Sequence, residues 1–560
     1  MEKIKLNKLK IIGLFILLLL FSCNSYYNKS LNSLSKAFNA WYLIHNPKIT
    51  NSLDPYNFYI KNNNMKSNFD NEYISDIKRF KLELMQIDKT KLYNENLYIY
   101  NSIEKKISDL IFNHKNFRYY QYDPSYYYEI INSHLLNILM EDKYENSYKI
   151  ESLIETLDII PSFINQIQKS ILVSNDFFVK RSNLELNKMN QLINDIPLYI
   201  DLNDEYLDLI IAKIEKNKKY LKINSEWLNK KLDISFELDI EKKYDAYNYQ
   251  IFSIENKYKY TNLLNSLELT IKSLQNNIFN LSLPLYLKNN DEPIWLDRQD
   301  TLDVVNYVIA NEFDNKSIEL DNISKVISFN VHYNHILSIL DSQGIVETNK
   351  FNQVNFPDYD YFFEQDNSLF LVNNSYNEKN IKILFNNNYE YINTNEIYSF
   401  IINEVIIKHI FNLYTNGNNN NKNNVSHYSW GNLLYQIIIN NSSNIFDPKF
   451  QIYYNMHLLK DFTMLLSKYK YISGDLKETE ALSYFFKESF IKKTNEREKD
   501  WFNGLYGNDF NFENYAAYIY MSNLYDDYCL INKKISTYKM IKKIFEHGFI
   551  PVNNYKTILN

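Results

Sequence analysis

Glycine and proline are scarce in this chain, and that scarcity is the feature that most constrains the fold. The 560 residues include 8 Gly and 10 Pro, while 45% of all residues are hydrophobic. Between residues 75 and 285, apolar side chains recur every three or four positions, with few helix breakers among them. This spacing is the period of an amphipathic helix that buries one face. The sequence therefore predicts a mainly α-helical fold with a large core.

The apolar pattern changes in the second half of the chain. From residue 345 to 395, short runs such as SLFLVNN and IKILFNN are separated by Asn and Asp, which predicts a small β segment. Helical spacing returns at 396–414. The chain has no internal repeat and no linker long enough to separate independent domains. We therefore expect one large helical domain at 36–560, with a helical N-terminal part of about 36–285 and a second part of about 286–560.

The N-terminus has the pattern of a secretory signal. Four lysines within the first ten residues precede an apolar run at 11–21, which is too short to span a bilayer. The run ends in LFSC, and a small residue directly before Cys23 resembles the lipobox of bacterial lipoproteins. The alternatives are an ordinary signal peptide with a chance cysteine and an uncleaved anchor.

The lipobox resemblance implies a lipoprotein signal peptide at 1–22, followed by a lipidated N-terminus and short tether at 23–35. Cys23 would carry the acyl chains, of the palmitate type, and would be the first residue of the mature protein. Two or three such chains hold a protein firmly to one leaflet. We therefore expect a cell-envelope protein with its ectodomain outside the cytoplasm and the membrane as its first partner.

Charge and glycine content exclude several classes of function. The formal net charge is −6, and loss of residues 1–22 with four lysines and one glutamate makes it about −9. A surface of that overall charge does not attract nucleic acid or anionic lipid headgroups. The sequence has no GxGxxG and no GxxxxGK[ST] motif, so dinucleotide and Walker-type phosphate loops are absent. We expect no cofactor and no nucleic-acid partner.

Six segments of the chain carry a family resemblance by their order and spacing. They are AFNAWYLIHNP at 37–47, NFRYYQYDPSYYYEIINSHL with Asp123, Pro124 and Tyr127, IETLDIIPSFINQIQKSIL, SNIFDPKF with KETEALSYFF, and IFEHGFIPVNNYKTIL with Gly548 and Pro551. Together they resemble the bacterial proteins grouped as domain of unknown function 885, which belong to the zincin-like metallopeptidase clan. The resemblance implies a large helical peptidase-related scaffold whose catalytic part lies at about 286–560.

The metal site of that family is degenerate here. Its pattern is His-Glu-x-x-Pro-Gly-His-His, followed downstream by Glu-Gly-Trp, because zinc needs about three protein ligands and a Glu that accepts the proton of the bound water. The matching positions in IINEVIIKHI are Asn403, Glu404 and His409, and the downstream acidic position is Tyr428. Asn and Tyr do not normally replace these ligands. The resemblance therefore implies relic candidates Glu404 and His409 without a working metal.

Helix geometry leads to the same expectation. Positions 403 and 409 lie about 240° apart around a regular α-helix. The family has Pro-Gly between them, where this chain has Ile407 and Lys408, which favour an unbroken helix. Glu404 and Lys408 would then form an i, i+4 pair on a solvated face.

Other polar positions of the family are also replaced, and the remaining histidines are weak ligand candidates. His332 and His335 share a helix face but lack a visible third ligand, and His427 lies in a loop. The replaced positions are Lys468, Lys470 and Ile472 in one segment, and Phe512, Glu513 and Asn514 in another.

Three hypotheses follow for function. The first is a pseudopeptidase, a lipid-anchored protein that binds peptide or envelope proteins without hydrolysing them and is not an enzyme. The second is an active zinc metallopeptidase with unconventional ligands, such as Glu404, His409 and His427 joined by Glu478 or Glu480. The third is a purely structural or adhesive surface lipoprotein.

Overall fold

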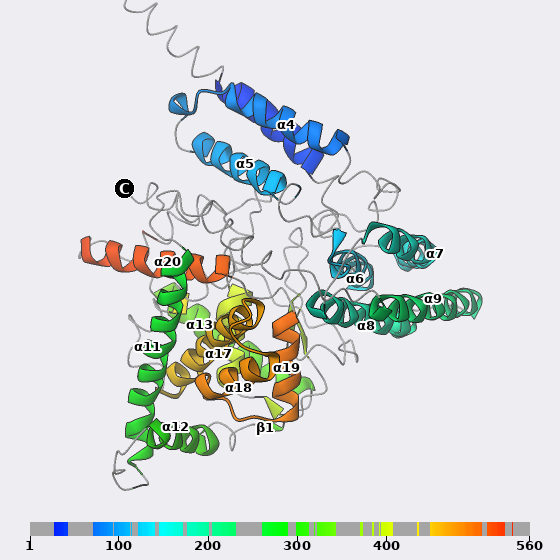
Figure 1. Ribbon diagram of the computed structural model, residues 1–560. Coiled ribbons are helices and arrows are strands. Elements are labelled where there is room, and N and C mark those ends of the chain that lie inside the picture. Colours follow the sequence, from blue (N-terminus) through cyan, green and yellow to red (C-terminus); the bar gives the residue numbers. More distant parts are fainter. Residues whose placement is uncertain are drawn as a thin grey trace, which may run out of the picture.

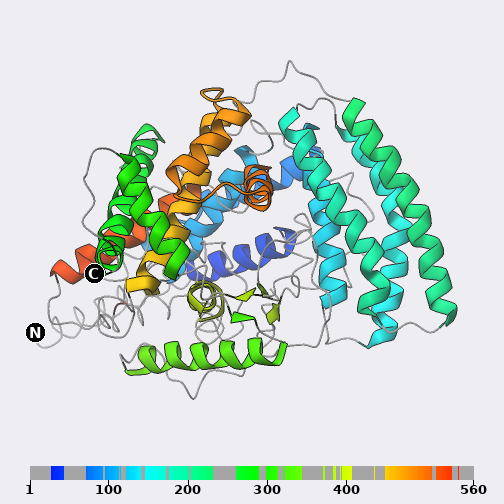
Figure 2. The ribbon, with the colours of Figure 1, turned by 90° about the horizontal axis from the view of Figure 1, so that it is seen from below.

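The fold is mainly α-helical, as predicted (Figures 1 and 2). The computed structural model describes residues 27–42, 71–92, 95–112, 114, 121–140, 145–171, 176–200, 204–230, 260–288, 290, 298–312, 318–319, 322–342, 370–372, 383–385, 391–392, 394–406, 434–435, 448–506, 512–531 and 540. Within these residues, no helix combines the length and the apolar character needed to cross a membrane.

The helices and strands have the following bounds. Residues 27–42 form the first described helix. The α-helices that follow are α4 (Asn71–Met85), α5 (Glu95–Phe112), α6 (Ser125–Met140), α7 (Asn146–Ser170), α8 (Asp176–Tyr199), α9 (Asp204–Lys230), α11 (Tyr260–Tyr286), α12 (Arg298–Glu312), α13 (Asn322–Ser342), α14 (Thr394–Phe400), α17 (Pro448–Ile472), α18 (Glu478–Glu488), α19 (Asn495–Tyr506) and α20 (Phe512–Ile531). A 3-10 turn η3 (Lys89–Lys91) follows α4, and a π-helix η8 (Ile401–Ile406) follows α14. Strand β1 (Ile318–Glu319) pairs antiparallel with β4 (Tyr391–Ile392), and β2 (Phe370–Val372) with β3 (Ile383–Phe385).

The helix of residues 27–42 begins four residues after Cys23 and packs against α4 and α5. Its apolar face repeats at Leu31, Leu34, Phe38 and Trp41, and all four side chains are buried. The expected tether at 23–35 is therefore too long, because its residues from 27 onward belong to this helix. The prediction missed it because Asn and Ser separate the apolar residues, while the three- and four-residue spacing that drives burial is intact.

Helices α6, α7, α8 and α9 form a bundle with its own core. Leucine and isoleucine side chains from all four helices meet in one cluster, as the cyan and green helices show in Figure 2. Polar contacts also cross this core: the Asn224 side chain on α9 donates to the Tyr128 hydroxyl on α6, and Gln168 on α7 donates to Asn224 at 3.1 Å. Buried polar groups are tolerated where they are paired in this way.

Pro161 lies inside α7. Proline has no backbone N–H, so the carbonyl four residues earlier, that of Leu157, loses its helical partner. Asn217 on α9 replaces this partner, since its Nδ2 donates to the Leu157 oxygen at 2.8 Å. Asn217 is fully buried. The proline in one helix therefore explains the buried asparagine in its neighbour.

The C-terminal half packs around α17. The core there joins residues of α11, α12, α13, α14, η8, α17 and α20. A separate cluster connects this half with the bundle: Phe177 and Phe178 at the start of α8 lie with Phe485 of α18 and Trp501 of α19. Trp501 is fully buried, and its Nε1 donates to the Ser467 hydroxyl on α17 at 3.2 Å.

We predict that Asn217→Ala destabilises the protein by about 1–3 kcal/mol, because it leaves the Leu157 carbonyl buried without a donor. Pro161→Ala restores the N–H that this carbonyl lacks. The double variant should therefore lose less stability than the sum of the two single variants. Urea unfolding of the four proteins measures this coupling. Additive effects would show that Asn217 does not act through the proline.

Candidate functional site

The π-helix η8 lies where the sequence resembles the metal-binding helix of the family. The four apolar residues Ile401, Ile402, Val405 and Ile406 are fully buried. The wider turn of a π-helix allows all four side chains to lie on one broad face. Three of them are isoleucine and one is valine, and β-branched residues crowd a tight α-turn. The expectation of a regular α-helix is therefore wrong for 401–406. Single π-turns of this kind are rare and often mark functional sites.

A cluster of ring side chains lies directly beside this π-helix. His335 Nδ1 on α13 lies 2.9 Å from the Tyr398 hydroxyl on α14, within hydrogen-bonding distance. The His332 ring, one turn earlier, lies 4.5 Å from the Tyr398 ring. Phe329 of α13 also contacts Phe400, the residue before the π-helix, at 6.3 Å between ring centroids. Helix α13 thus presents both histidines next to the segment that carries position 404.

Burial favours the uncharged forms of His332 and Tyr398 in this cluster. Burial and the neighbouring His335 both lower the pKa of His332, with burial the larger cause. Burial raises the pKa of the Tyr398 hydroxyl, which therefore keeps its proton. The His332 Nδ1 atom is buried without a hydrogen bond among the described residues. A neutral imidazole nitrogen with a free lone pair can accept a hydrogen bond or bind a metal ion.

The other predicted site residues lie largely outside the described part of the chain. The backbone at Asn403 and Glu404 belongs to the π-helix, but their side chains lie outside the description. His409, Tyr428 and Cys23 also lie outside it, as does His427. In the part of the chain that the structure describes, no group of three or more His, Cys, Asp or Glu side chains could hold a metal ion.

The two carboxylates considered as further ligands have other partners. Glu478 Oε2 at the start of α18 lies 2.6 Å from Lys180 Nζ on α8. Glu480 Oε2 accepts the backbone N–H of Lys477 at 2.8 Å and so caps the same helix. Both groups stabilise the start of α18 and its contact with α8.

Three positions that the family resemblance treats as replaced make structural contacts, whereas the side chains of Glu513 and Asn514 lie outside the described residues. Lys470 Nζ lies 3.3 Å from Glu268 on α11 and above the Tyr484 ring. Ile472 is buried at the end of α17, and Phe512 is buried at the start of α20 with its ring against Tyr469. These positions fill and brace the core instead of lining a polar site.

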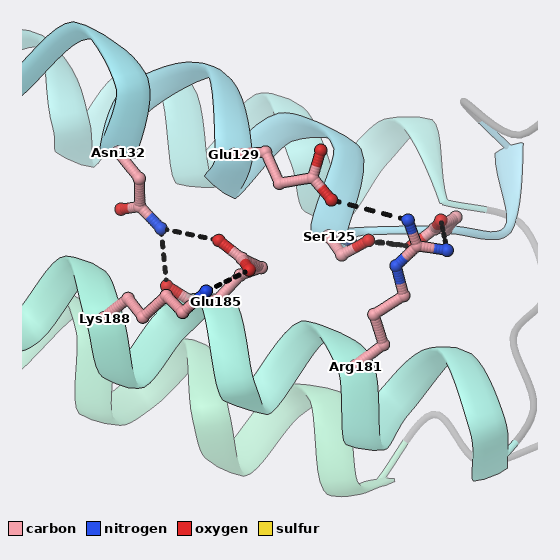
Figure 3. A network of polar contacts seen from close by, with 7 residues as sticks. Ser125, Glu129, Asn132, Arg181, Glu185 and Lys188 are labelled. Atoms are coloured by element: carbon pink, nitrogen blue, oxygen red, sulfur yellow. Dashed lines mark hydrogen bonds and ion pairs between the residues drawn. The ribbon is translucent and has the colours of Figure 1, made fainter. Parts of the chain in front are cut away.

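Sequence reasoning missed a buried ionic network between α6 and α8, shown in Figure 3. The Arg181 guanidinium lies 3.5 Å from Asp123 and 3.5 Å from Glu129. Arg181 and Asp123 are about one-tenth exposed or less. Asp123 also accepts the Ser125 backbone N–H at 3.0 Å, so it caps the start of α6. The sequence signal is the Asp-Pro pair at a helix start. This pair predicts a helix cap, but it does not reveal the distant arginine that contacts the capping aspartate.

The network continues one turn along the same two helices. Asn132 Nδ2 donates to the backbone oxygen and to the Oε2 of Glu185, both at 2.9 Å, and Glu185 pairs with Lys188 (Figure 3). Every carboxylate drawn there has a cation or an amide donor. These contacts position the two helices, while Arg181 Nε and Asn132 Oδ1 are buried without a hydrogen-bond partner among the described residues.

Comparisons with known proteins identify the fold. No family model matches the sequence, and no curated protein sequence matches it. A candidate lipoprotein of unknown function from Shewanella oneidensis superposes with a TM-score of 0.67 at 14% identity, over 87% of this chain and 92% of that chain. A candidate lipoprotein from Colwellia psychrerythraea gives a TM-score of 0.56 at 12% identity, over 76% and 78% of the two chains. This chain shares its fold with both.

We predict that His332 titrates below the ordinary histidine pKa of about 6.5, because its protonated form is buried beside a second imidazole. The folded protein then binds fewer protons at this position than the unfolded chain, so the contribution of His332 to stability falls as the pH drops below about 6.5. Histidine NMR titration measures the pKa, with His332→Gln to assign the signal. His335→Gln should raise the pKa of His332. A His332 pKa at or above the ordinary value would contradict this account.

Proposed function

We propose that this chain is a lipid-anchored cell-envelope protein, held to the membrane by acyl chains on Cys23, and that its peptidase-like scaffold binds peptide or envelope proteins without hydrolysing them. The observation that carries the anchoring is the position of helix 27–42, which is packed into the core four residues after Cys23. The lipobox-like LFSC sequence supports it. The two structures with this fold, both described as candidate lipoproteins, support it as well.

The non-catalytic part of the proposal rests on the side chains at the former ligand positions. Asn403 and Tyr428 stand where the family resemblance implies zinc ligands. Nearby polar positions have become core or bracing residues, such as Ile472 and Phe512. Glu478 and Glu480 hold the start of α18. A scaffold whose polar positions are reused in this way favours binding over hydrolysis.

An active zinc metallopeptidase is the second candidate, and one observation favours it. His332 and His335 lie on α13, which packs beside the π-helix that carries Glu404. Two imidazoles and a carboxylate are the donor types of catalytic zinc sites. In this reading the zinc ligands would be Glu404 and His409, together with either the two histidines of α13 or His427.

The anchoring predicts a mature protein that begins at an acylated Cys23. Mass spectrometry of the N-terminal peptide, after expression in a bacterium that processes lipoproteins, should show Cys23 with its acyl chains. Cys23→Ala should abolish acylation and release the protein from the membrane fraction, whereas Cys529→Ala should leave both unchanged. A mature N-terminus at another residue, or a Cys23 without acyl chains, would refute the anchoring.

The loss of catalysis predicts that the purified protein binds no stoichiometric zinc after dialysis against trace zinc. Elemental analysis of the wild type, Glu404→Ala, His409→Ala and His332→Ala measures the metal. All four should be equally metal-poor and equally folded by circular dichroism. Stoichiometric zinc in the wild type that disappears in Glu404→Ala and His409→Ala would instead establish the second candidate.

A further inference from the structure

The solvent-facing side of α4 exposes two large apolar side chains among lysines. Leu82 is 62% exposed and Met85 is 67% exposed, and their three-residue spacing puts them on one face of the helix. Lys78, Lys81 and Lys91 are exposed around them. We call these five residues the α4 patch.

The lysines of the α4 patch have no ion-pair partner among the described residues, although Lys91 interacts electrostatically with the Asp88 carboxylate. Arg79 on the same helix pairs with Asp76 and Glu83, and Lys89 pairs with Glu104 on α5. By contrast, the three lysines of the patch form no ion pair with any residue that the structure describes. The patch therefore offers apolar area together with the positive charges of Lys78 and Lys81 on one helix face.

The α4 patch lies at the end of α4 that is nearest to Cys23 along the fold. The Phe38 ring meets the Phe80 ring at 5.3 Å, and the Trp41 ring meets the Tyr73 ring at 5.3 Å, so helix 27–42 runs antiparallel to α4. The two blue helices lie side by side in Figure 1. The first residues of helix 27–42 are therefore close to the C-terminal half of α4, which holds Leu82 and Met85.

The length of the tether limits how far this surface can lie from a bilayer. Only residues 24–26 separate Cys23 from the helix that starts at residue 27. A fully extended chain of four residues spans at most about 14 Å. An acylated Cys23 would thus keep this end of the molecule within about one helix diameter of the headgroup region.

We propose that the α4 patch is a membrane-contact surface that docks onto anionic phospholipid headgroups and orients the ectodomain on the bilayer. This inference rests on the proposed acylation of Cys23. Lysines attract anionic headgroups, while apolar side chains such as Leu82 and Met85 enter the boundary between headgroups and acyl chains. Helix 27–42 adds Lys29 and Lys36 and carries no acidic residue, so the charge at this end also complements an anionic surface.

The test uses the acylated full-length chain reconstituted on vesicles of phosphatidylcholine and phosphatidylglycerol that contain a nitroxide-labelled lipid. Cys529→Ala removes the second cysteine, and a fluorophore is placed at Met85→Cys. The matched control is a fluorophore at Leu269→Cys on α11, a site with the same 67% exposure and away from α4 in Figure 1. Mass spectrometry of the same samples reports acylation of Cys23.

The lipid nitroxide should quench the Met85→Cys label several-fold more strongly than the Leu269→Cys label. Replacing phosphatidylglycerol by phosphatidylcholine, or changing Lys78, Lys81 and Lys91 to Glu, should weaken the quenching at Met85→Cys. Near an anionic surface each lysine contributes roughly fivefold in membrane affinity. Unlabelled triple-variant protein with unchanged circular dichroism controls for folding.

Two results would overturn the inference and separate it from the proposed anchoring. Equal quenching at both labels in protein with an acylated Cys23 would refute the membrane contact of α4 alone. Cys23 without acyl chains would refute the proposed function, and this inference with it. Strong quenching at Met85→Cys that does not depend on phosphatidylglycerol would refute the recognition of anionic headgroups.

Discussion

The buried Arg181 guanidinium is the interaction on which the arrangement of the helices most depends. It joins α8 to the start of α6 through Asp123 and to the next turn through Glu129. One turn earlier on α8, Phe177 enters the cluster around Trp501 of α19. A short stretch of α8 therefore fixes the bundle internally and also joins it to the C-terminal helices. Loss of the cation would remove the positive charge that lies against Asp123 and Glu129, and breaking a buried ion pair costs about 3–5 kcal/mol.

The bundle shows how the helices compensate each other's backbone defects. Pro161 removes a hydrogen bond within α7, and Asn217 of α9 supplies the missing donor. Seven residues further along α9, on the same face, Asn224 reaches the Tyr128 hydroxyl of α6. Polar residues at buried helical positions would be unfavourable alone, yet each of these meets a defined partner. This makes the packing of α9 specific, because a shifted α9 would leave the Leu157 carbonyl unpaired.

The helical class could be predicted from the sequence because period and composition determine it locally, as the three- and four-residue spacing in α7 and α9 shows. Long-range pairings could not be predicted. The sequence reveals a capping Asp123 and an interior Pro161 but not Arg181 or Asn217, which lie more than fifty residues away and are selected only by tertiary packing. The candidate site shows the same difference between local features and long-range contacts. The adjacency of His332 and His335 is local, because it follows from helical spacing. Their contact with Tyr398 and the π-turn arise from the packing of α13 on α14.

The proposed anchoring at Cys23 would constrain what the rest of the molecule can bind. Helices 27–42 and α4 lie at one end of the molecule, whereas α12, α17 and α18 lie toward the other (Figure 1). If the α4 patch rests on the bilayer, the histidine cluster on α13 belongs to the part that projects away from it. Within that cluster, burial lowers the pKa of His332 and raises that of Tyr398, which favours the uncharged form of each. The rings of His332 and Tyr398 in that position would suit a peptide or protein segment bound through hydrogen bonds and apolar contacts.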